Sequence, residues 1–528
     1  MKIRYILLLI ITVLGVSSCY DDKGNYSYDP KNDIKITFDA SYFEAILGEK
    51  IKLTPRLTFA IDSNDVDLSY KWTFLGKEIS DQRNLEWVVD TVTSNHNVYL
   101  NVTDNRTGVT FSGGISAMLS SAYAKEAWVV LAKQNGKSVL SYIRETQEDD
   151  GSEYGKFTYT DIPDIYQLVN GEELGTEPVR VLEHFAARGG IGHFWVLQNG
   201  GQGCVDLSGE DFTKDILLND IFLDGNLPVD FKPIDMIDMK WLTCVVNHDG
   251  KVYTRKKLTN QLYNSGYFID RPLEFENEEV DGSRMVLAPF SDLNYTVMYD
   301  KVHNRFLAMA DLKKETSGKV VKFTVDESGY APDFARLDNL GNMKVLNNGY
   351  YEGKEGESGD QGYYSILRDR TTGNYYTHDF RVNAMSESSN PSAFPVLQCQ
   401  IDLNQVINGT SKNVFNVLRS WVYGDDFGTP YVLISKDNEL WLYDRDAKMP
   451  VEKYYEFPQG QIITAIDSES VGSRRVAIGM QSGEFYVLDL TRKAVNGQKE
   501  KLIYASTHNF GEIVHIRYKV CSGNGWGY

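Results

Sequence analysis

The chain lacks the short motifs by which many enzymes and metal proteins are identified from sequence alone. It contains no Gly-x-Ser-x-Gly nucleophile motif, no His-Glu-x-x-His zinc motif and no complete Gly-x-x-x-x-Gly-Lys-Ser/Thr phosphate loop. It also has no Cys-x-x-Cys pair, and its eight histidines are scattered. The sequence therefore gives no local support to a zinc site or to nucleophilic catalysis. We predict no cofactor, no bound metal and no catalytic residue.

Basic residues are in deficit. Lysine and arginine number 54 against 73 aspartates and glutamates, which gives the 528-residue chain a formal charge of -19. A surface of this sign repels the phosphates of nucleic acids and anionic lipid headgroups. We therefore expect no nucleic acid partner.

Cysteine is scarce as well, with five residues in the whole chain. Four of them are scattered singly over the last two thirds of the sequence, which is far from the density of a disulfide scaffold. We interpret these four as buried free thiols: Cys204, Cys244, Cys399 and Cys521. The fifth, Cys19, stands in a different setting.

A long apolar run is missing, but a short one begins the chain. Lys2 and Arg4 precede apolar residues 6–13, which is the layout of a secretory signal. This run is far shorter than the ~20 residues that a membrane-spanning helix needs. The Val-Ser-Ser-Cys that follows at 16–19 resembles the lipobox of bacterial lipoproteins, whose cysteine is diacylated before cleavage. We predict a lipoprotein signal peptide over 1–18 and a lipid anchor on Cys19; an ordinary signal with a chance cysteine is the alternative.

The residues after Cys19 are acidic. Tyr-Asp-Asp-Lys at 20–23 resembles the export signal that places Bacteroidetes lipoproteins on the outer face of the outer membrane. We therefore predict that residues 19–30 form an acidic linker after the lipidated cysteine. The lipid would hold the protein on the outer membrane, facing the cell exterior. A solvated linker without a targeting role is the alternative.

Residues 31–120 show the alternation of half-buried strands. Over 68–74, the side chains of Leu68, Tyr70, Trp72 and Phe74 fall on one face. Further strands are predicted at 34–38, 46–55, 97–104 and 109–111. About 90 residues with a central tryptophan strand and a late tyrosine strand are typical of an immunoglobulin-like sandwich, in which Trp72 is expected to be a core residue.

Two motifs in this region point to a family. The Tyr-x-Trp strand at 70–72 and the Val-Thr-Asp at 102–104 resemble a PKD-type domain. With the Cys-Tyr-Asp-Asp-Lys-Gly-Asn-Tyr-Ser-Tyr stretch at 19–28, they make the chain similar to the PKD-like family lipoproteins of Bacteroidetes. The resemblance is specific over residues 19 to about 120 and looser beyond. It implies a surface lipoprotein, often encoded beside outer-membrane nutrient importers, and it implies no catalytic residues.

Residues 122–528 repeat one pattern: an apolar strand, a tight polar turn and a second strand rich in tyrosine or valine. Asn-Gly, Asp-Gly and Ser-Gly pairs suit such turns because Asn and Gly accept positive φ. The turns are predicted at Asn135, Asn199, Asp249, Asn304, Gly373, Asn438 and Gly483. A spacing of roughly 60 residues is enough for a four-stranded blade with long loops.

Long helical periodicity is absent from this region, so we predict a β-propeller of seven blades over 122–528. The segment 512–520 is expected to pair near Ala127 and close the ring. A string of unrelated β-sandwiches is the alternative, which the irregular spacing leaves open. The propeller is favoured because the region has no clear linker and the hairpins need a common way to cover their edges. The whole chain is thus predicted to be all-β, with an immunoglobulin-like (PKD-type) sandwich followed by a propeller.

Exposed aromatic residues are the remaining candidates for ligand contact. The chain has 33 tyrosines, and a Tyr or Trp ring covers the flat apolar face of a sugar at low entropic cost. Trp421, Tyr423 and Trp526 stand in polar or glycine-rich surroundings and are our candidate ligand-binding residues. Capping of the propeller is the alternative role for Trp526. The adjacent carboxylates Asp425 and Asp426 are expected to be solvent-exposed.

Three functions remain open at this point. The first is a non-catalytic surface lipoprotein that binds a glycan or another nutrient polymer and works with outer-membrane importer proteins. The second is a structural subunit that docks on an outer-membrane complex. The third is a propeller glycoside hydrolase or lyase, which would need a pair of carboxylates. The negative charge makes a neutral glycan a better expected ligand than an anionic polymer.

Overall fold

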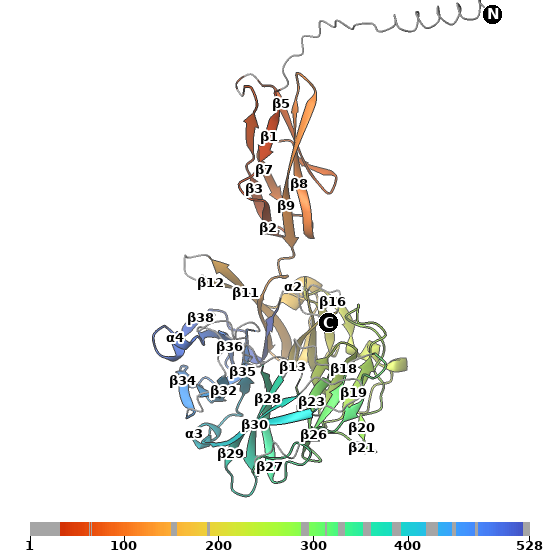
Figure 1. Ribbon diagram of the computed structural model, residues 1–528, viewed down its shortest axis with the longest axis vertical. Helices are drawn as coiled ribbons and strands as arrows, with labels where there is room; N and C mark the ends of the chain where they lie inside the picture. Colours follow the sequence, from red (N-terminus) through yellow and green to blue (C-terminus); the bar gives the residue numbers. More distant parts are fainter. Residues whose placement is uncertain are drawn as a thin grey trace, which may run out of the picture. The chain divides into compact units, whose positions relative to one another are not determined.

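The computed structural model describes residues 32–62, 64, 66–148, 156–186, 191–282, 284–286, 295–311, 314–325, 333–351, 361–382, 392–418, 431–445, 450–469 and 474–520. Within them the chain is almost entirely β-structure, as predicted, with a few short helices (Figure 1). It divides into two compact units, 1–120 and 121–528. No helix of the described ranges is long and apolar enough to cross a membrane. The predicted signal peptide, the linker 19–30 and Cys19 lie outside these ranges.

The first unit packs one five-stranded sheet and two strand pairs around a single core. Its strands are β1 (Ile34–Thr37), β2 (Tyr42–Ile46), β3 (Lys50–Leu53), β4 (Arg56–Phe59), β5 (Leu68–Phe74), β6 (Lys77–Ser80), β7 (Leu85–Val88), β8 (Thr93–Asp104) and β9 (Val109–Ser120). The large sheet has the order β2-β9-β8-β5-β6, and β1 pairs with β4 and β3 with β7. This is the predicted sandwich, although its short strands β2, β4, β6 and β7 were not predicted from the sequence.

Trp72 lies at the centre of that core. Its side chain is fully buried, and its Nε1 donates a hydrogen bond to the Gln82 carbonyl at 2.8 Å. Phe74, on the same face of β5, is also buried and packs on Trp87 with ring centroids 5.1 Å apart. The core role predicted for Trp72 is therefore confirmed.

The second unit begins with a sheet that contains both ends of the unit. Its order is β16-β15-β14-β13-β11-β10-β39, and β12 pairs with the outer edge of β11. Its strands are β10 (Ala127–Gln134), β11 (Lys137–Glu148), β12 (Lys156–Ile162), β13 (Gly175–His184), β14 (His193–Gly200), β15 (Val205–Ser208), β16 (Lys214–Leu217) and β39 (Glu512–Lys519). Only two residue pairs join β11 to β13, so the sheet consists of two four-stranded groups.

Further sheets follow in chain order, antiparallel in all but one short strand pair. They are formed by β17 (Pro233–Asp238), β18 (Leu242–Asn247) and β19 (Val252–Lys256); by β22 (Arg284–Val286), β23 (Tyr295–Asp300), β24 (Arg305–Ala310) and β25 (Val320–Val321); by β27 (Met343–Tyr351), β28 (Gln361–Asp369), β29 (Tyr375–Val382) and β30 (Ser392–Ile401), with β26 (Thr324–Val325) beside β30; by β31 (Phe415–Val417), β32 (Tyr431–Lys436), β33 (Glu439–Asp444) and β34 (Glu452–Glu456); and by β35 (Ile463–Ser468), β36 (Arg475–Met480), β37 (Phe485–Asp489) and β38 (Leu502–Ala505). A small pair, β20 (Glu274–Phe275) and β21 (Glu278–Glu279), lies between β19 and β22 in the chain.

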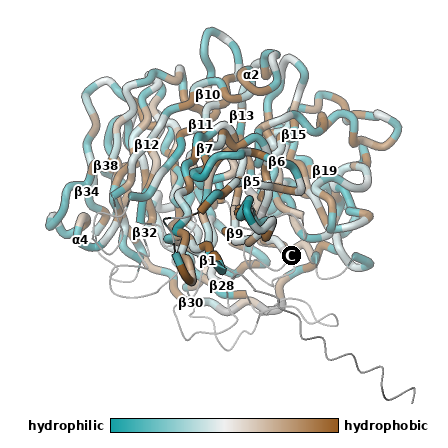
Figure 2. Tube along the Cα trace, turned by 90° about the horizontal axis from the view of Figure 1, so that it is seen from above, coloured by the Kyte–Doolittle hydropathy of each residue, from teal (hydrophilic) through white to brown (hydrophobic). Residues whose placement is uncertain are grey.

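Buried apolar clusters join each sheet to the next, and the last sheet to the first. Trp195 of β14 and Val245 of β18 belong to one such cluster, for example, and Trp128 of β10 and Ala477 of β36 belong to another. Figure 2 shows the sheets spread around this unit, with β15 and β19 on one side and β32, β34 and β38 on the other. A closed succession of antiparallel sheets joined face to face is a β-propeller. The predicted fold is confirmed, whereas the number of seven blades stays a prediction.

Strand β39 closes the ring. It pairs antiparallel with β10, and Trp128 lies opposite Tyr518 in the ladder. The last strand of the chain thus completes the sheet that begins with the first strand of the propeller, as predicted. Such closure removes the free edges that would otherwise invite pairing with other chains.

The predicted hairpin turns lie between strands of the described sheets, with one displacement. At the first turn, Asn135 and Gly136 both adopt positive φ, of 52° and 82°, which is the geometry of a two-residue hairpin. Asn199, however, lies inside β14, and the chain turns after it at Gly201 and Gly203, both with positive φ. The glycines supply the left-handed conformation that was attributed to the asparagine.

The cysteines are free thiols where the structure describes them. Cys204 and Cys244 are buried, and burial raises the pKa of the Cys204 thiol to about 12, which makes it unreactive. Cys399 is half-buried rather than buried, with Sγ 3.0 Å from the Thr377 hydroxyl, so its predicted burial was too strong. Cys521 lies outside the described residues.

His378 leads to a prediction about pH. Its imidazole is buried among the rings of Phe306, Phe334 and Phe380, and Nε2 donates to the Ala335 carbonyl at 2.8 Å. Burial lowers the pKa of His378 from 6.5 to about 4. Because the unfolded chain takes up this proton at a higher pH, the folded state should lose about 3 kcal/mol as the pH falls from 6.5 to 4.

Urea unfolding of the wild type and of His378→Gln between pH 7.5 and 4.5 measures this loss. The wild-type free energy of unfolding should fall more steeply with acid than that of the variant. Parallel pH profiles for the two proteins would show that His378 is not buried as a neutral base.

Candidate functional site

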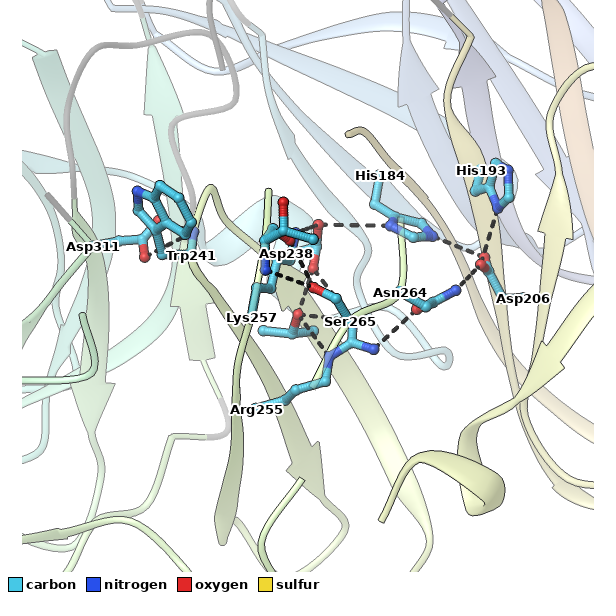
Figure 3. A network of polar contacts seen from close by, with 12 residues as sticks. His184, His193, Asp206, Asp238, Trp241, Arg255, Lys257, Asn264, Ser265 and Asp311 are labelled. Carbon is cyan, nitrogen blue, oxygen red and sulfur yellow. Dashed lines mark hydrogen bonds and ion pairs between the residues drawn. The ribbon is translucent and has the colours of Figure 1, made fainter. Parts of the chain in front are cut away.

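A network of charged side chains lies buried where the strands of two neighbouring propeller sheets end (Figure 3). His184 ends β13, Asp238 ends β17, and Arg255 stands near the end of β19. The first and third strands of an antiparallel sheet end at the same edge, so the fold brings these residues to one face of the propeller. Lys257 follows β19 directly and joins the same group.

Asp206 is the centre of one half of this network. Asp206 belongs to β15 and its side chain is completely buried. Its carboxylate accepts hydrogen bonds from His184 Nε2 at 2.8 Å and from His193 Nδ1 at 3.0 Å. Asn264 Nδ2 donates a third hydrogen bond, at 2.6 Å. Burial alone would favour the protonated acid, but the two histidines outweigh it and hold the pKa of Asp206 at about 2. Asp206 is therefore an ionised carboxylate facing two imidazoles.

His184 lies between two carboxylates. Its Nε2 faces Asp206, and its Nδ1 lies 3.6 Å from the Asp238 carboxylate. Burial opposes a charge on this ring, yet the two carboxylates raise the pKa of His184 to about 9. The Trp195 ring stacks on it at 6.0 Å. The ring is thus held by a hydrogen bond at Nε2 and covered by an indole on one face, with a second carboxylate near Nδ1.

Asp238 organises the other half. Lys257 Nζ lies 2.6 Å from one of its oxygens, and the Thr243 hydroxyl donates to the other at 2.5 Å. Burial raises the pKa of a carboxyl, but Lys257 and His184 hold the pKa of Asp238 well below its usual range. Arg255, fully buried, donates to the Thr243 hydroxyl and to Asn264 Oδ1. Buried charges of this kind are tolerated only when each is paired and hydrogen-bonded.

A third sheet contributes Asp311, which follows β24. Its two carboxylate oxygens accept the Trp241 backbone N–H at 3.1 and 3.0 Å, and the Trp241 carbonyl in turn accepts the Lys257 N–H at 2.8 Å. Burial raises the pKa of Asp311 to about 7. The network therefore ties the edges of three successive sheets together.

The segment 257–273, here called the exposed loop, contacts the network through the side chains of Tyr263 and Asn264. The Tyr263 ring stacks on His193 with centroids 3.5 Å apart, its hydroxyl donates to the Ile191 carbonyl, and Asn264 binds Asp206. Phe268 is fully buried, and its carbonyl accepts the Leu223 N–H at 2.9 Å. Beside these anchors, four apolar side chains of the loop are exposed to solvent: Leu258, Leu262, Tyr267 and Ile269.

The structure places none of the residues that the sequence suggested as ligand-binding candidates. Trp421, Tyr423 and Trp526 lie outside the described residues, as do Asp425 and Asp426. Sequence reasoning missed the network because its members are far apart along the chain and match no motif. One signal was available: a charged residue interrupts an apolar strand at Val-Asp-Leu 205–207, and a histidine heads the apolar strand that begins at 193.

The described residues contain one group of side chains with the composition of a metal site. The ligand atoms of His184, His193 and Asp206 all lie within 4.8 Å of one another. Imidazole nitrogens with a carboxylate oxygen suit transition metals, and the same groups also form hydrogen-bonded proton networks.

Residues 19–178 match the PKD-like family. The matched segment spans the first unit and continues into β13 of the propeller. No curated protein matches the sequence significantly. Among solved structures, a quinonprotein alcohol dehydrogenase-like protein from Bacteroides thetaiotaomicron is similar over 92% of this chain and 99% of its own, with 12% identity and a TM-score of 0.39. BamB from Moraxella catarrhalis is similar over 73% and 89%, with 10% identity and a TM-score of 0.31. These likenesses carry no conclusion about activity.

Proposed function

We propose that this protein is a lipid-anchored binding protein of the outer cell surface. In this proposal the chain is held on the outer membrane by lipid on Cys19, as in the lipoproteins of Bacteroidetes that its N-terminal sequence resembles. The propeller binds a neutral glycan or another nutrient polymer without catalysis, and outer-membrane importer proteins take up the bound polymer.

The observation that carries the proposal is the exposed loop. Tyr267 is 57% exposed, more than any other aromatic side chain in the described part of the chain. Its neighbours on both sides are anchored, because Tyr263 and Asn264 contact the buried network and Phe268 is in the core. A loop that is already ordered loses little conformational entropy on binding, and a tyrosine ring can cover a sugar face.

The charge of the chain selects among polymers. A protein with a net charge of -19 repels an anionic polysaccharide, and the loop offers apolar side chains rather than cations for contact. A neutral glycan is therefore the expected ligand class.

A glycan array tests this proposal. The full chain carrying Cys19→Ala, for solubility, should bind neutral glycans, and a further Tyr267→Ala should weaken binding about tenfold, since a ring contact contributes up to roughly 1.4 kcal/mol. Tyr42→Ala is the matched control, because Tyr42 is an exposed tyrosine of the first unit at 50% and should have no effect.

The array also separates the alternatives. Binding to no glycan would contradict the proposal and favour a structural subunit that docks on an outer-membrane complex. Turnover of a bound polysaccharide would instead indicate a propeller glycoside hydrolase or lyase. Binding confined to anionic polymers, or unaffected by Tyr267→Ala, would contradict the stacking role of the exposed loop.

A further inference from the structure

Three side chains that can bind a metal converge on one face of one sheet. His184 and His193 lie directly opposite each other in the ladder of β13 and β14, and His193 lies opposite Ser208 of β15. Asp206 is two residues from Ser208 and therefore on the same face of β15. Three consecutive strands thus fix the separation of two imidazoles and one carboxylate, which Figure 3 shows facing one another.

We propose that His184, His193 and Asp206 bind one divalent transition-metal ion, for which Zn²⁺ is the probe. Two imidazole nitrogens and a carboxylate oxygen are the donor set of sites with three protein ligands and one open position. Calcium and magnesium prefer oxygen ligands alone, so the histidines exclude them.

The distances suit such an ion. With bonds of about 2.1 Å, the ligand atoms of a tetrahedral zinc lie about 3.4 Å apart. Here His184 Nε2 lies 2.8 Å from Asp206 Oδ1 and His193 Nδ1 lies 3.0 Å from Asp206 Oδ2, and one ligand atom from each residue lies within 4.8 Å of the other two. Small side-chain rotations would therefore open the site without moving the strands.

The surroundings of the three ligands match those of a built metal site. Metal-binding histidines usually direct their second ring nitrogen at a carboxylate, which fixes the ring and strengthens the ligand. The second nitrogen of His184, Nδ1, faces Asp238 at 3.6 Å, and Lys257 holds that carboxylate in place at 2.6 Å. Asn264 likewise positions Asp206, at 2.6 Å. The partners that would orient the ligands are thus part of the fold.

The site has an open side. The side chains of His184 and Asp206 are 1% and 0% exposed, whereas that of His193 is 15% exposed. Asp215, 47% exposed, has a carboxylate oxygen 3.9 Å from His193 Nδ1. A metal ion can therefore enter past His193, and either Asp215 or a water molecule can complete its coordination.

Titration of the full chain with Zn²⁺, and with Co²⁺ for its visible absorption, tests the proposal. The wild type should bind one equivalent, with the absorption of a tetrahedral cobalt site. His193→Gln and Asp206→Asn should each weaken binding at least 100-fold, and Asp238→Asn should weaken it 10–100-fold as a positioning residue. His248→Gln is the matched control, since its exposed imidazole also contacts an aspartate, Asp230, at 2.9 Å, and it should bind as the wild type does.

Two results would overturn the proposal. One is a wild type that binds no equivalent of either ion at micromolar concentration, which would leave the cluster as a hydrogen-bonded support of the sheet edge. The other is binding that His193→Gln retains or that His248→Gln removes. If Asp206→Asn fails to fold by circular dichroism, His193→Gln decides, because that side chain lies at the open side of the cluster. Failure of metal binding leaves glycan binding by the exposed loop untouched, so the two proposals are tested separately.

Discussion

Replacing Arg475 with methionine should lower the free energy of unfolding by about 3–5 kcal/mol, because the buried Glu145 would lose its cation and the buried Glu469 would keep only its longer contact with Arg474, at 3.5 Å. Arg475 begins β36, in the last sheet of the propeller. It binds Glu145 of β11 through two hydrogen bonds, at 2.8 and 3.2 Å, and it forms an ion pair with Glu469 after β35. All three side chains are less than a tenth exposed. Because Glu145 belongs to the sheet that β39 completes, this ion triad lies at the closure of the ring.

Two aromatic side chains also contact this ion triad. The Arg475 guanidinium lies 3.8 Å from the centroid of the Phe157 ring, and the Tyr518 hydroxyl of β39 donates to Glu145 at 3.3 Å. Burial opposes the charge, but Glu469 and Glu145 outweigh it and raise the pKa of Arg475. The guanidinium therefore stays charged at every accessible pH.

Lys453→Met is the matched control in chemical unfolding. Lys453 also bridges two carboxylates, Glu439 at 3.1 Å and Glu456 at 2.6 Å, but its side chain is 40% exposed. Water screens such a surface pair, so its loss should cost less than about 1 kcal/mol. Adding Glu145→Gln and Glu469→Gln to Arg475→Met should restore part of the stability. Equal effects of the Arg475 and Lys453 changes would contradict a buried ion triad at the closure.

Cys19→Ala should move the protein from the membrane fraction to the soluble fraction of its native cells. Each buried methylene of an acyl chain contributes about 0.8 kcal/mol, so several chains on one cysteine hold a protein durably and their loss releases it. Fractionation and metabolic labelling with palmitate measure both consequences. Cys399→Ala, which removes a half-buried free thiol, is the control and should stay in the membrane fraction. Palmitate labelling that survives Cys19→Ala would contradict the anchor.

The propeller was predictable from the sequence because its signals are local. An Asn-Gly pair such as 135–136 needs only two residues to specify a hairpin, and the strands on either side are rich in apolar residues. The closing strand was predictable for the same reason, since 512–520 is an unpaired strand pattern at the end of a series of hairpins. The number of blades depends on less regular segments and stays a prediction.

The network around Asp206 was not predictable from sequence in the same way. His184 and Asp238 are 54 positions apart and belong to different sheets, so no spacing rule connects them. Only the register of β13, β14 and β15 puts His184, His193 and Asp206 on one face. The anchoring of Tyr267 is likewise a tertiary effect, because Phe268 is buried against Phe222 of a distant segment.

Isothermal titration of the full chain with a neutral oligosaccharide chosen from the array tests the central claim most directly. We predict saturable binding to the wild type, binding about tenfold weaker to Tyr267→Ala and unchanged binding to Tyr42→Ala. The claim would be contradicted by binding that Tyr42→Ala weakens and Tyr267→Ala does not, or by heat of binding seen only with anionic polymers.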